Sequence, residues 1–171
     1  MRRRAGFTLL ELVVVIGLVG IFASVALDRL LRYQEIAEKT AMEATLGALR
    51  SAQALQVSAR ILSGGLASAS ALEDENPIDW LAEPPQGYLG ALHNPPLGDV
   101  PKGSWYFDLK DKELVYRPRQ TRFLSVPESG DDRLRFKVVI RLSQPIAAVH
   151  FNGISEMTVR PVTPVRWSPE G

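Results

Sequence analysis

The sequence predicts an α+β protein in which a long N-terminal helix packs on a C-terminal antiparallel β-sheet. The first third of the chain is an apolar run followed by alanine and leucine at helical spacing, with no proline up to Ser63. From residue 104 onwards, apolar and polar residues alternate, which is the period of a half-buried strand. Residues 64–103, rich in proline and glycine, separate the two patterns. A helix laid on an antiparallel sheet is an α+β arrangement.

The apolar run covers residues 7–27 and is long enough to cross a membrane. Glu11 is its only strongly polar residue, and Thr8 and Ser24 supply the only other polar groups. A helix rises about 1.5 Å per residue and the apolar core of a bilayer is roughly 30 Å thick, so the run can span it. The basic leader residues Arg2, Arg3 and Arg4 predict that the short N-terminus stays in the cytoplasm.

Glu11 requires an explanation, because an ionised carboxylate inside a bilayer costs about 2.5–3.5 kcal/mol. Residues 7–27 contain no Lys, Arg or His that could pair with it. A free α-amino group on Phe7 of a neighbouring copy, exposed by cleavage after Gly6, would provide the opposite charge. Alternatively, Glu11 lies near the lipid headgroups, solvated, in a simple signal anchor. The residues alone leave both interpretations open.

The leader arginines, Gly6, the sequence Phe7-Thr8-Leu9-Leu10-Glu11 and the Val/Ile/Leu/Gly/Ala helix together resemble the class III signal of type IV pilins and type II secretion pseudopilins. The resemblance implies that a prepilin peptidase cuts between Gly6 and Phe7 and that Phe7 is then N-methylated. It also implies that Glu11 helps subunits dock in a filament, and that the fold is a type IV pilin-like roll. The sequence departs from the family at Asp28, where many members carry a proline that breaks the helix.

Residues 28–63 are expected to continue the helix outside the membrane. Charged side chains crowd its first turns, so this part is expected to face solvent. Gly64-Gly65 predicts the end of the helix after Ser63. We interpret the apolar face as packing on the protein's own sheet after about Met42, and as helix-to-helix contact in a filament before it. This face combines an alanine-rich stripe with an adjacent strip of larger side chains: Ala37, Ala41, Ala44, Ala48, Ala52, Leu55 and Ala59, then Met42, Leu46, Leu49, Val57 and Ile61.

Residues 64–103 are expected to form a structured connection with little regular structure. Six of the 12 prolines fall here, and proline disrupts both helices and ladders. A short helix is expected at residues 78–81. Five apolar side chains are expected to fix the segment to the core: Trp80, Leu81, Tyr88, Leu89 and Leu92.

Residues 104–171 are expected to form the sheet. Strands 104–109 and 113–117 form a hairpin around Lys110-Asp111-Lys112, and a short strand is expected at 122–126. The clearest strand is 133–142, whose even-numbered residues from Leu134 to Leu142 are all apolar. That face should meet the helix, and the basic face should meet water. A last strand is expected at 156–160.

Length and composition favour one soluble domain with a membrane anchor. The expected organisation is a cleaved leader at 1–6, a transmembrane and assembly helix at 7–27, and one globular domain. That domain contains the helix 28–63, the connection 64–103 and the sheet region 104–171. There is no cysteine, so no disulfide is expected. Removing three arginines from 20 basic residues leaves 17 against 19 acidic ones, a net charge of −2, which argues against a generally nucleic-acid-binding surface.

The domain shows no catalytic constellation, so we expect no enzyme activity and no cofactor. His93 and His150 have no second ligand at metal spacing. Asp131-Asp132 with Asp108 or Asp111 would suggest calcium, which some pseudopilins bind, but the Asp-x-Asp-x-Asp-Gly pattern is missing and we expect no metal site. A basic series could hold DNA, as in some competence pilins, although a solvated sheet face is favoured: Arg117, Arg119, Arg122, Arg133, Arg135, Lys137 and Arg141.

Together these observations predict a structural subunit of a type IV pilin-like filament, most specifically a type II secretion system pseudopilin or a minor pilin. The protein would be a single-pass inner-membrane protein with its C-terminal domain in the periplasm before it enters a pilus or pseudopilus. Its partners would be the prepilin peptidase/methyltransferase, other pilin or pseudopilin subunits, the inner-membrane assembly platform and the lipid bilayer; nucleic acid is not expected. The alternatives are a signal-anchored periplasmic binding module that does not polymerise, and a DNA-uptake (competence) pilin.

Overall fold

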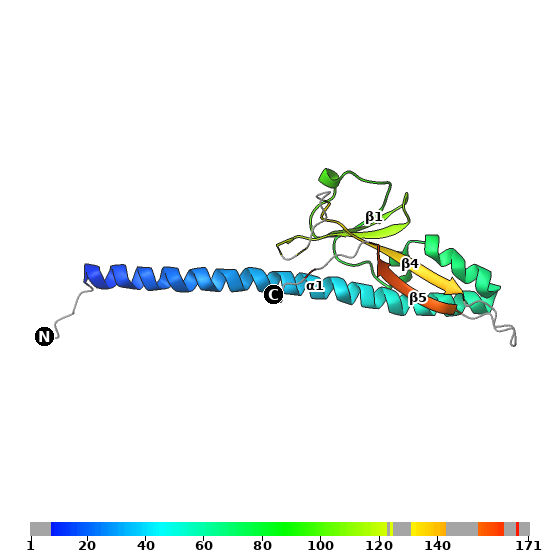
Figure 1. Cartoon of the computed structure of the whole chain (residues 1–171), viewed down its shortest axis with the longest axis horizontal. Coiled ribbons are helices and arrows are strands. Elements are labelled where there is room, and N and C mark those ends of the chain that lie inside the picture. The colour runs from blue at the N-terminus through cyan, green and yellow to red at the C-terminus, as the bar shows by residue number, and fades with distance from the viewer. Residues whose placement is uncertain (1–7, 123, 125–130, 143–153, 163–166, 168–171) are drawn as a thin grey trace. The chain divides into compact units, whose positions relative to one another are not determined.

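The computed structural model covers the whole chain and describes residues 8–122, 124, 131–142, 154–162 and 167. Backbone contacts divide the chain into two compact units, residues 1–37 and residues 38–171 (Figure 1). We call the second unit the globular unit. All strands formed by the described residues lie in it.

Helix α1, Leu9–Ser70, provides all the secondary structure of the first unit. Its N-terminal part is apolar on every side, and side chains such as Ile16 and Phe22 are exposed. Within the described residues, α1 is the one helix long and apolar enough to cross a membrane. The backbone stays helical through Asp28, so the helix break that a proline introduces in many pilin-like proteins does not occur at this position.

The predicted helix end at Gly64-Gly65 is wrong, because α1 continues to Ser70 and passes into the 3₁₀ helix η1, Ala71–Asp74. Glycine inside a helix costs about 1 kcal/mol relative to alanine. Ala69 and Leu72, which follow the glycine pair, are fully buried in the core. Burial of one large apolar side chain contributes about 1.5–3 kcal/mol, so packing after the glycines outweighs their low helix propensity.

Only one of the two predicted strips of α1 packs on the sheet. Met42, Leu46, Leu49 and Val57 are buried in the main core. The alanine-rich stripe stays largely exposed, including Leu55, which is 73% exposed. The interpretation that the whole face after Met42 packs on the protein's own sheet is therefore wrong for that stripe. The larger side chains remove more apolar area from water, and they face the sheet.

The connection between helix and sheet is more regular than the sequence suggests. It contains η1, the predicted short helix as η2, Pro77–Trp80, and a third 3₁₀ helix η3, Leu97–Asp99. It also contains an unpredicted strand, β1, Tyr88–Leu92. As expected, Trp80, Leu81 and Tyr88 pack against the main core, whereas Leu89 is 41% exposed.

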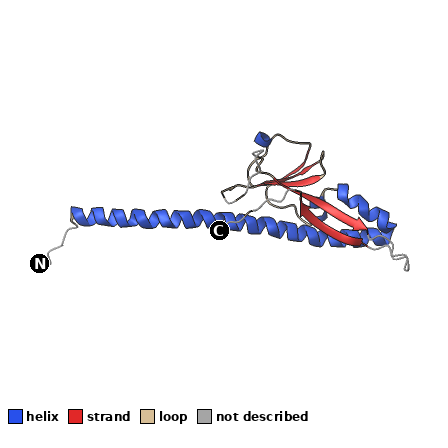
Figure 2. Ribbon diagram, in the orientation of Figure 1, coloured by secondary structure: helices blue, strands red, loops and turns tan. Residues whose placement is uncertain are grey.

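The five strands form one sheet in the order β1-β2-β3-β4-β5. The other strands are β2 Ser104–Asp108, β3 Glu113–Arg117, β4 Leu134–Leu142 and β5 Ile154–Pro161. The α+β prediction is confirmed, with one difference: β1 pairs parallel to β2, so the sheet is mixed rather than purely antiparallel. Figure 2 shows the C-terminal strands beside the C-terminal half of α1. Of the expected strand at 122–126, the structure describes Arg122, which lies in a turn, and Leu124, which forms an isolated bridge to Trp167.

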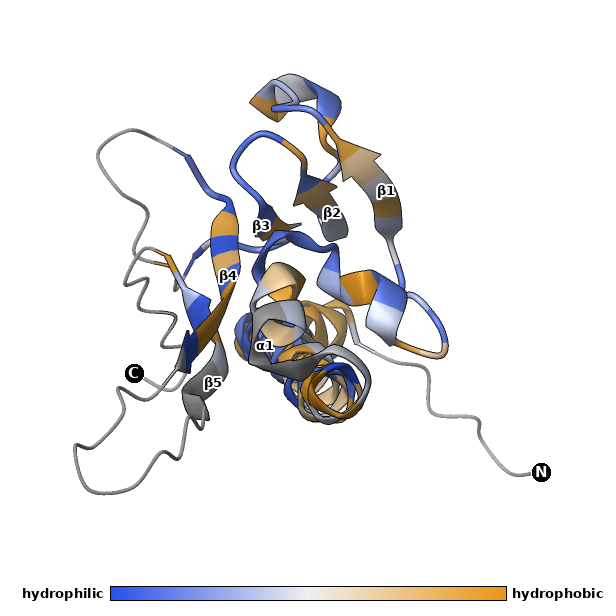
Figure 3. Ribbon diagram, turned by 90° about the vertical axis from the view of Figure 1, so that its right-hand side faces the viewer, coloured by the Kyte–Doolittle hydropathy of each residue, from blue (hydrophilic) through white to orange (hydrophobic). Residues whose placement is uncertain are grey.

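The sheet buries side chains on both faces around β2 and β3. Trp105 and Tyr116 point into the main core with α1, with ring centroids 4.5 Å apart. Their neighbours Tyr106 and Val115 form a second cluster with Val100 on the other face. On β4 the predicted alternation is confirmed: Leu134, Phe136, Val138 and Ile140 are buried, while Lys137 and Arg141 are exposed. Figure 3 shows this alternation as apolar and polar bands along β4.

Candidate functional site

The first candidate site is the start of α1, where Glu11 lies in the first helical turn. The hydroxyl of Thr8 accepts a hydrogen bond from the backbone N–H of Glu11 at 3.2 Å, which caps the helix. A carboxylate in the first turn also interacts favourably with the positive end of the helix dipole. Residues 1–7 lie outside the described residues, so the structure shows nothing of Arg2, Arg3, Arg4, Gly6 or Phe7.

Glu11 is exposed and forms no ion pair with any described residue. All its neighbours from Leu12 to Leu27 are uncharged. A carboxylate on an otherwise apolar helix surface has a strong preference for a cationic partner once water is removed. The geometry therefore leaves the acid accessible to a group from another molecule, and such a group must be cationic to offset the cost of burial.

The second candidate site is the basic series on the sheet, which the structure resolves into ion pairs. Arg133 binds Asp131 in a bidentate arrangement, with both nitrogen–oxygen distances 2.8 Å. Arg117 donates to Asp132 at 3.2 Å and to the backbone carbonyls of Leu97 and Val100. These contacts tie the connection and Asp132, just before β4, to the sheet.

Arg135 completes this network of arginines. Its guanidinium nitrogens lie 3.3 Å from a carboxylate oxygen of Glu113, 3.6 Å from one of Asp131 and 3.8 Å from one of Asp111. At least three of the seven basic residues in the series therefore have carboxylate partners among the described residues: Arg117, Arg133 and Arg135. Much less free positive charge is left for a polyanion than the sequence count suggests.

The same network includes the acidic pair Asp131 and Asp132 just before β4. Partial burial alone would raise the pKa of Asp131, but hydrogen bonds from Arg133 and the charges of Arg133 and Arg135 outweigh it and hold the pKa below its ordinary value of 3.8. Asp131 and Asp132 thus accept hydrogen bonds from arginines, a role that the sequence did not indicate. No group of three or more His, Cys, Asp or Glu side chains able to hold a metal occurs among the described residues. His93 is exposed, and His150 lies outside the described part of the chain.

A third cluster links α1 to the sheet through Glu38, the first residue of the globular unit. Its carboxylate accepts hydrogen bonds from the Tyr116 hydroxyl at 2.7 Å and from the backbone N–H of Arg119 at 2.6 Å. A third bond comes from the N–H of Gln120 at 3.3 Å. Burial, together with the hydrogen bond to Glu38, raises the pKa of Tyr116 well above its ordinary value. Glu38 was missed in the sequence, since one acid among several on early helical turns carries no distinguishing signal.

Comparison with known proteins gives one match, at the N-terminus. Residues 1–27 match the family model of the prokaryotic N-terminal methylation motif. This motif is a class III prepilin signal and is typical of type IV pilin-like proteins. No curated protein and no solved structure matches the chain. The match covers the leader and the apolar run, and it supports processing by a prepilin peptidase.

Proposed function

We propose that this chain is a structural subunit of a type IV pilin-like filament, specifically a type II secretion system pseudopilin or a minor pilin. The observation that supports this most is the N-terminal methylation motif at residues 1–27, directly ahead of an apolar helix able to cross a membrane. The globular unit adds a packed core and a sheet, and the described residues hold no metal cluster. The role proposed for it is to assemble with neighbouring subunits.

Maturation would begin at the leader. A prepilin peptidase cuts between Gly6 and Phe7, and Phe7 then becomes the N-methylated first residue. Arg2, Arg3 and Arg4 keep this segment in the cytoplasm, where the cut occurs. The apolar helix holds the subunit in the inner membrane, with the globular unit in the periplasm, until an assembly platform draws it into the filament.

Assembly would bring Glu11 to the N-terminal amine of Phe7 on a neighbouring subunit. Leaving Glu11 unpaired in an apolar surrounding costs about 2.5–3.5 kcal/mol, so pairing favours the assembled register over others. Lipid tails are as apolar as these side chains, so close packing between helices, which small residues such as Gly17 and Gly20 allow, would supply the remaining attraction. Other pilin or pseudopilin subunits would complete the filament.

The test is the mass of the N-terminal peptide, measured in membranes and in sheared surface filaments from cells with an active prepilin peptidase. We expect a peptide that begins at N-methylated Phe7. Its presence in the sheared fraction would assign the chain to a surface pilus, and its restriction to membranes would favour a secretion pseudopilus or a scarce subunit. A peptide that still begins at Met1 or Arg2 would contradict the proposal and leave a signal-anchored periplasmic module.

A further inference from the structure

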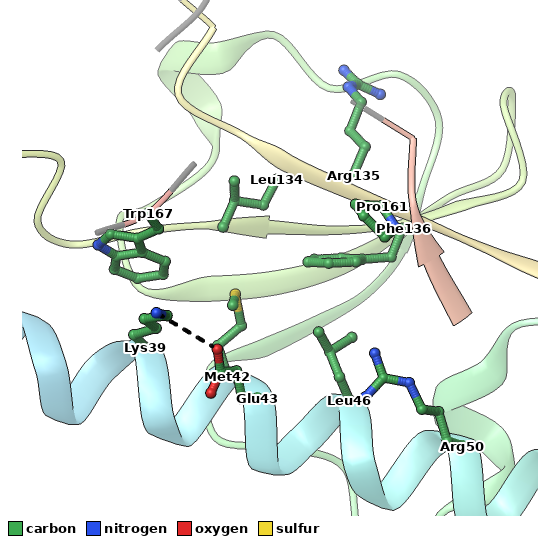
Figure 4. A pocket seen from close by; sticks show the side chains of 10 residues that line it. All are labelled: Lys39, Met42, Glu43, Leu46, Arg50, Leu134, Arg135, Phe136, Pro161 and Trp167. Atoms are coloured by element: carbon green, nitrogen blue, oxygen red, sulfur yellow. Dashed lines mark ion pairs between the residues drawn. The ribbon is translucent and has the colours of Figure 1, made fainter. Parts of the chain in front are cut away.

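A half-open groove of about 330 Å³ lies between α1 and the β4–β5 end of the sheet, entirely within the globular unit. In Figure 4, Met42 and Leu46 of the helix face Leu134, Phe136 and Trp167 across the groove. The lining is therefore mainly apolar, and two of its members are aromatic. Such a lining with a few polar groups at its edge is typical of a binding site.

The edge of the groove carries four charged side chains, of which three are neutralised. Arg135 is surrounded by carboxylates, and the Lys39 ammonium lies 3.9 Å from the Glu43 carboxylate. Arg50 is exposed and forms no hydrogen bond or ion pair with any described residue. Figure 4 places Arg50 and Trp167 at opposite ends of the groove. The site thus offers an aromatic apolar surface and one available guanidinium.

This combination fits a rigid apolar segment that carries a carboxylate at one end. Guanidinium binds a carboxylate through paired hydrogen bonds. Proline-rich segments bind aromatic-lined grooves well, because they are already extended and lose little entropy on binding. The expected ligand is therefore a short peptide in which an acidic residue stands next to proline.

The chain itself displays such a segment on its surface. Residues 82–85 read Ala-Glu-Pro-Pro and follow η2, with Ala82, Glu83 and Pro84 exposed. Glu83 forms no hydrogen bond or ion pair with any described residue. The two prolines fix their own φ angles, which lowers the conformational entropy that the loop loses on binding. None of these residues lines the groove of the same copy.

We propose that the groove binds the 82–85 loop of a second copy, with Glu83 paired to Arg50. The two contacting surfaces are different, so the contact is heterologous. In a pair, one copy keeps a free loop and the other keeps a free groove, and each can engage a further copy. Such contacts extend into an open helical array instead of closing as a dimer. This inference rests on the proposed filament function and names the surfaces through which neighbouring globular units meet.

The chain contains no cysteine, so any thiol cross-link between copies must join cysteines that were introduced. The test uses the full chain in membranes with Pro161→Cys on the groove edge and Ala82→Cys on the loop, treated with a short bismaleimide. Pro161 lines the groove, is exposed and carries no charge, so the ion pairs at the groove stay intact. A ladder of cross-linked multimers is expected. The matched control replaces Pro161→Cys by Lys110→Cys, an exposed position outside the groove, and should give no ladder above single-cysteine chains.

Charge exchange in the same cysteine background tests the ion pair. Arg50→Glu and Glu83→Arg should each weaken the ladder by about fivefold, as expected for an exposed ion pair replaced by repulsion. The double variant should restore it. Absence of the ladder, or failure of the double variant to recover, would overturn the groove contact. Leader cleavage measured in the same samples reports on the proposed function separately, because neither Arg50 nor Glu83 belongs to the N-terminal motif.

Discussion

In the proposed filament, assembly would move Glu11 from an exposed position into an apolar interface between helices. In the structure it is exposed in the first turn of α1, with Thr8 holding the backbone around it. The carboxylate is stable at a membrane surface but requires a counter-charge in an apolar interface. Loss of the Glu11 carboxylate should therefore impair filament assembly and leave folding and leader cleavage unchanged.

We expect Glu11→Ala to be cleaved normally but to enter filaments poorly, because the paired charge that fixes the register is lost. The measurement compares the cleaved fraction in membranes with the amount recovered in sheared filaments. Asp74→Ala provides the control, since Asp74 is an exposed acid in η1 of the globular unit and does not line the groove. Normal incorporation of the Glu11 variant would rule out the docking role.

Asp131 gives the globular unit a defined dependence on pH. Its pKa is lower in the folded state than the ordinary 3.8, so its stabilising effect is fully present above 3.8 and is lost as the pH falls through the lower folded value. We expect Asp131→Asn to lower the free energy of unfolding by a constant amount at neutral pH. That difference should shrink in strong acid, as urea titrations across pH would show. An equal difference at all pH values would contradict the ion-pair origin.

At the scale of elements, α1 presents two apolar strips with different roles. The strip with Met42, Leu46 and Leu49 packs on the sheet, and the alanine-rich stripe remains outside. Sequence periodicity predicts both strips. It does not predict which of them faces the sheet, because that depends on how the later strands pack against the helix.

The two strips can be distinguished by matched leucine substitutions. Leu49→Ala should lower the free energy of unfolding by about 2–5 kcal/mol, since it leaves a cavity at a fully buried position. Leu55→Ala changes the same side chain at a position that is 73% exposed and should have an effect within roughly 0.5 kcal/mol. Urea unfolding of the two variants provides the comparison. Similar losses for both would show that the packed face is misassigned.

Other elements show where local sequence patterns suffice and where they do not. Strand β4 was predictable because its alternation extends over nine residues and only one face is buried. Strand β1 was missed because its five residues lie among prolines and glycines, and Gly90 at φ 95° interrupts any pattern. The helix end was wrong because burial of Ala69 and Leu72 comes from distant contacts. Glu11 could be identified from sequence since it is an isolated acid in an apolar run, whereas Glu38 acquires its role only through Tyr116.

For the whole molecule, the decisive asymmetry is the charge before the apolar helix. Three arginines precede it, while Arg29 and Arg32 follow it beside Asp28. Excess basic residues mark the cytoplasmic side of a membrane span. The leader should therefore fix the orientation of the whole chain before any filament contact forms.

We expect replacement of Arg2, Arg3 and Arg4 by Glu to reduce the fraction of chains whose globular unit reaches the periplasm. A single cysteine introduced at exposed Leu62 reports the orientation of the chain. A membrane-impermeant thiol reagent is applied to cells with a permeable outer membrane, so that it labels only cysteines on the periplasmic side. The parent chain with the same cysteine serves as the reference. Unchanged labelling would show that other segments determine the topology.

The position of Glu38 has a mechanical consequence. Its carboxylate joins the first turn of the globular unit to the Tyr116 hydroxyl at the end of β3 and to two backbone N–H groups just beyond it. A pull on the anchored end of α1 must therefore break these three bonds together before it can peel the following apolar turns away one by one. Bonds loaded in parallel share the force, so in the proposed filament subunit this carboxylate would resist separation of α1 from the sheet when the helix is pulled from the bilayer.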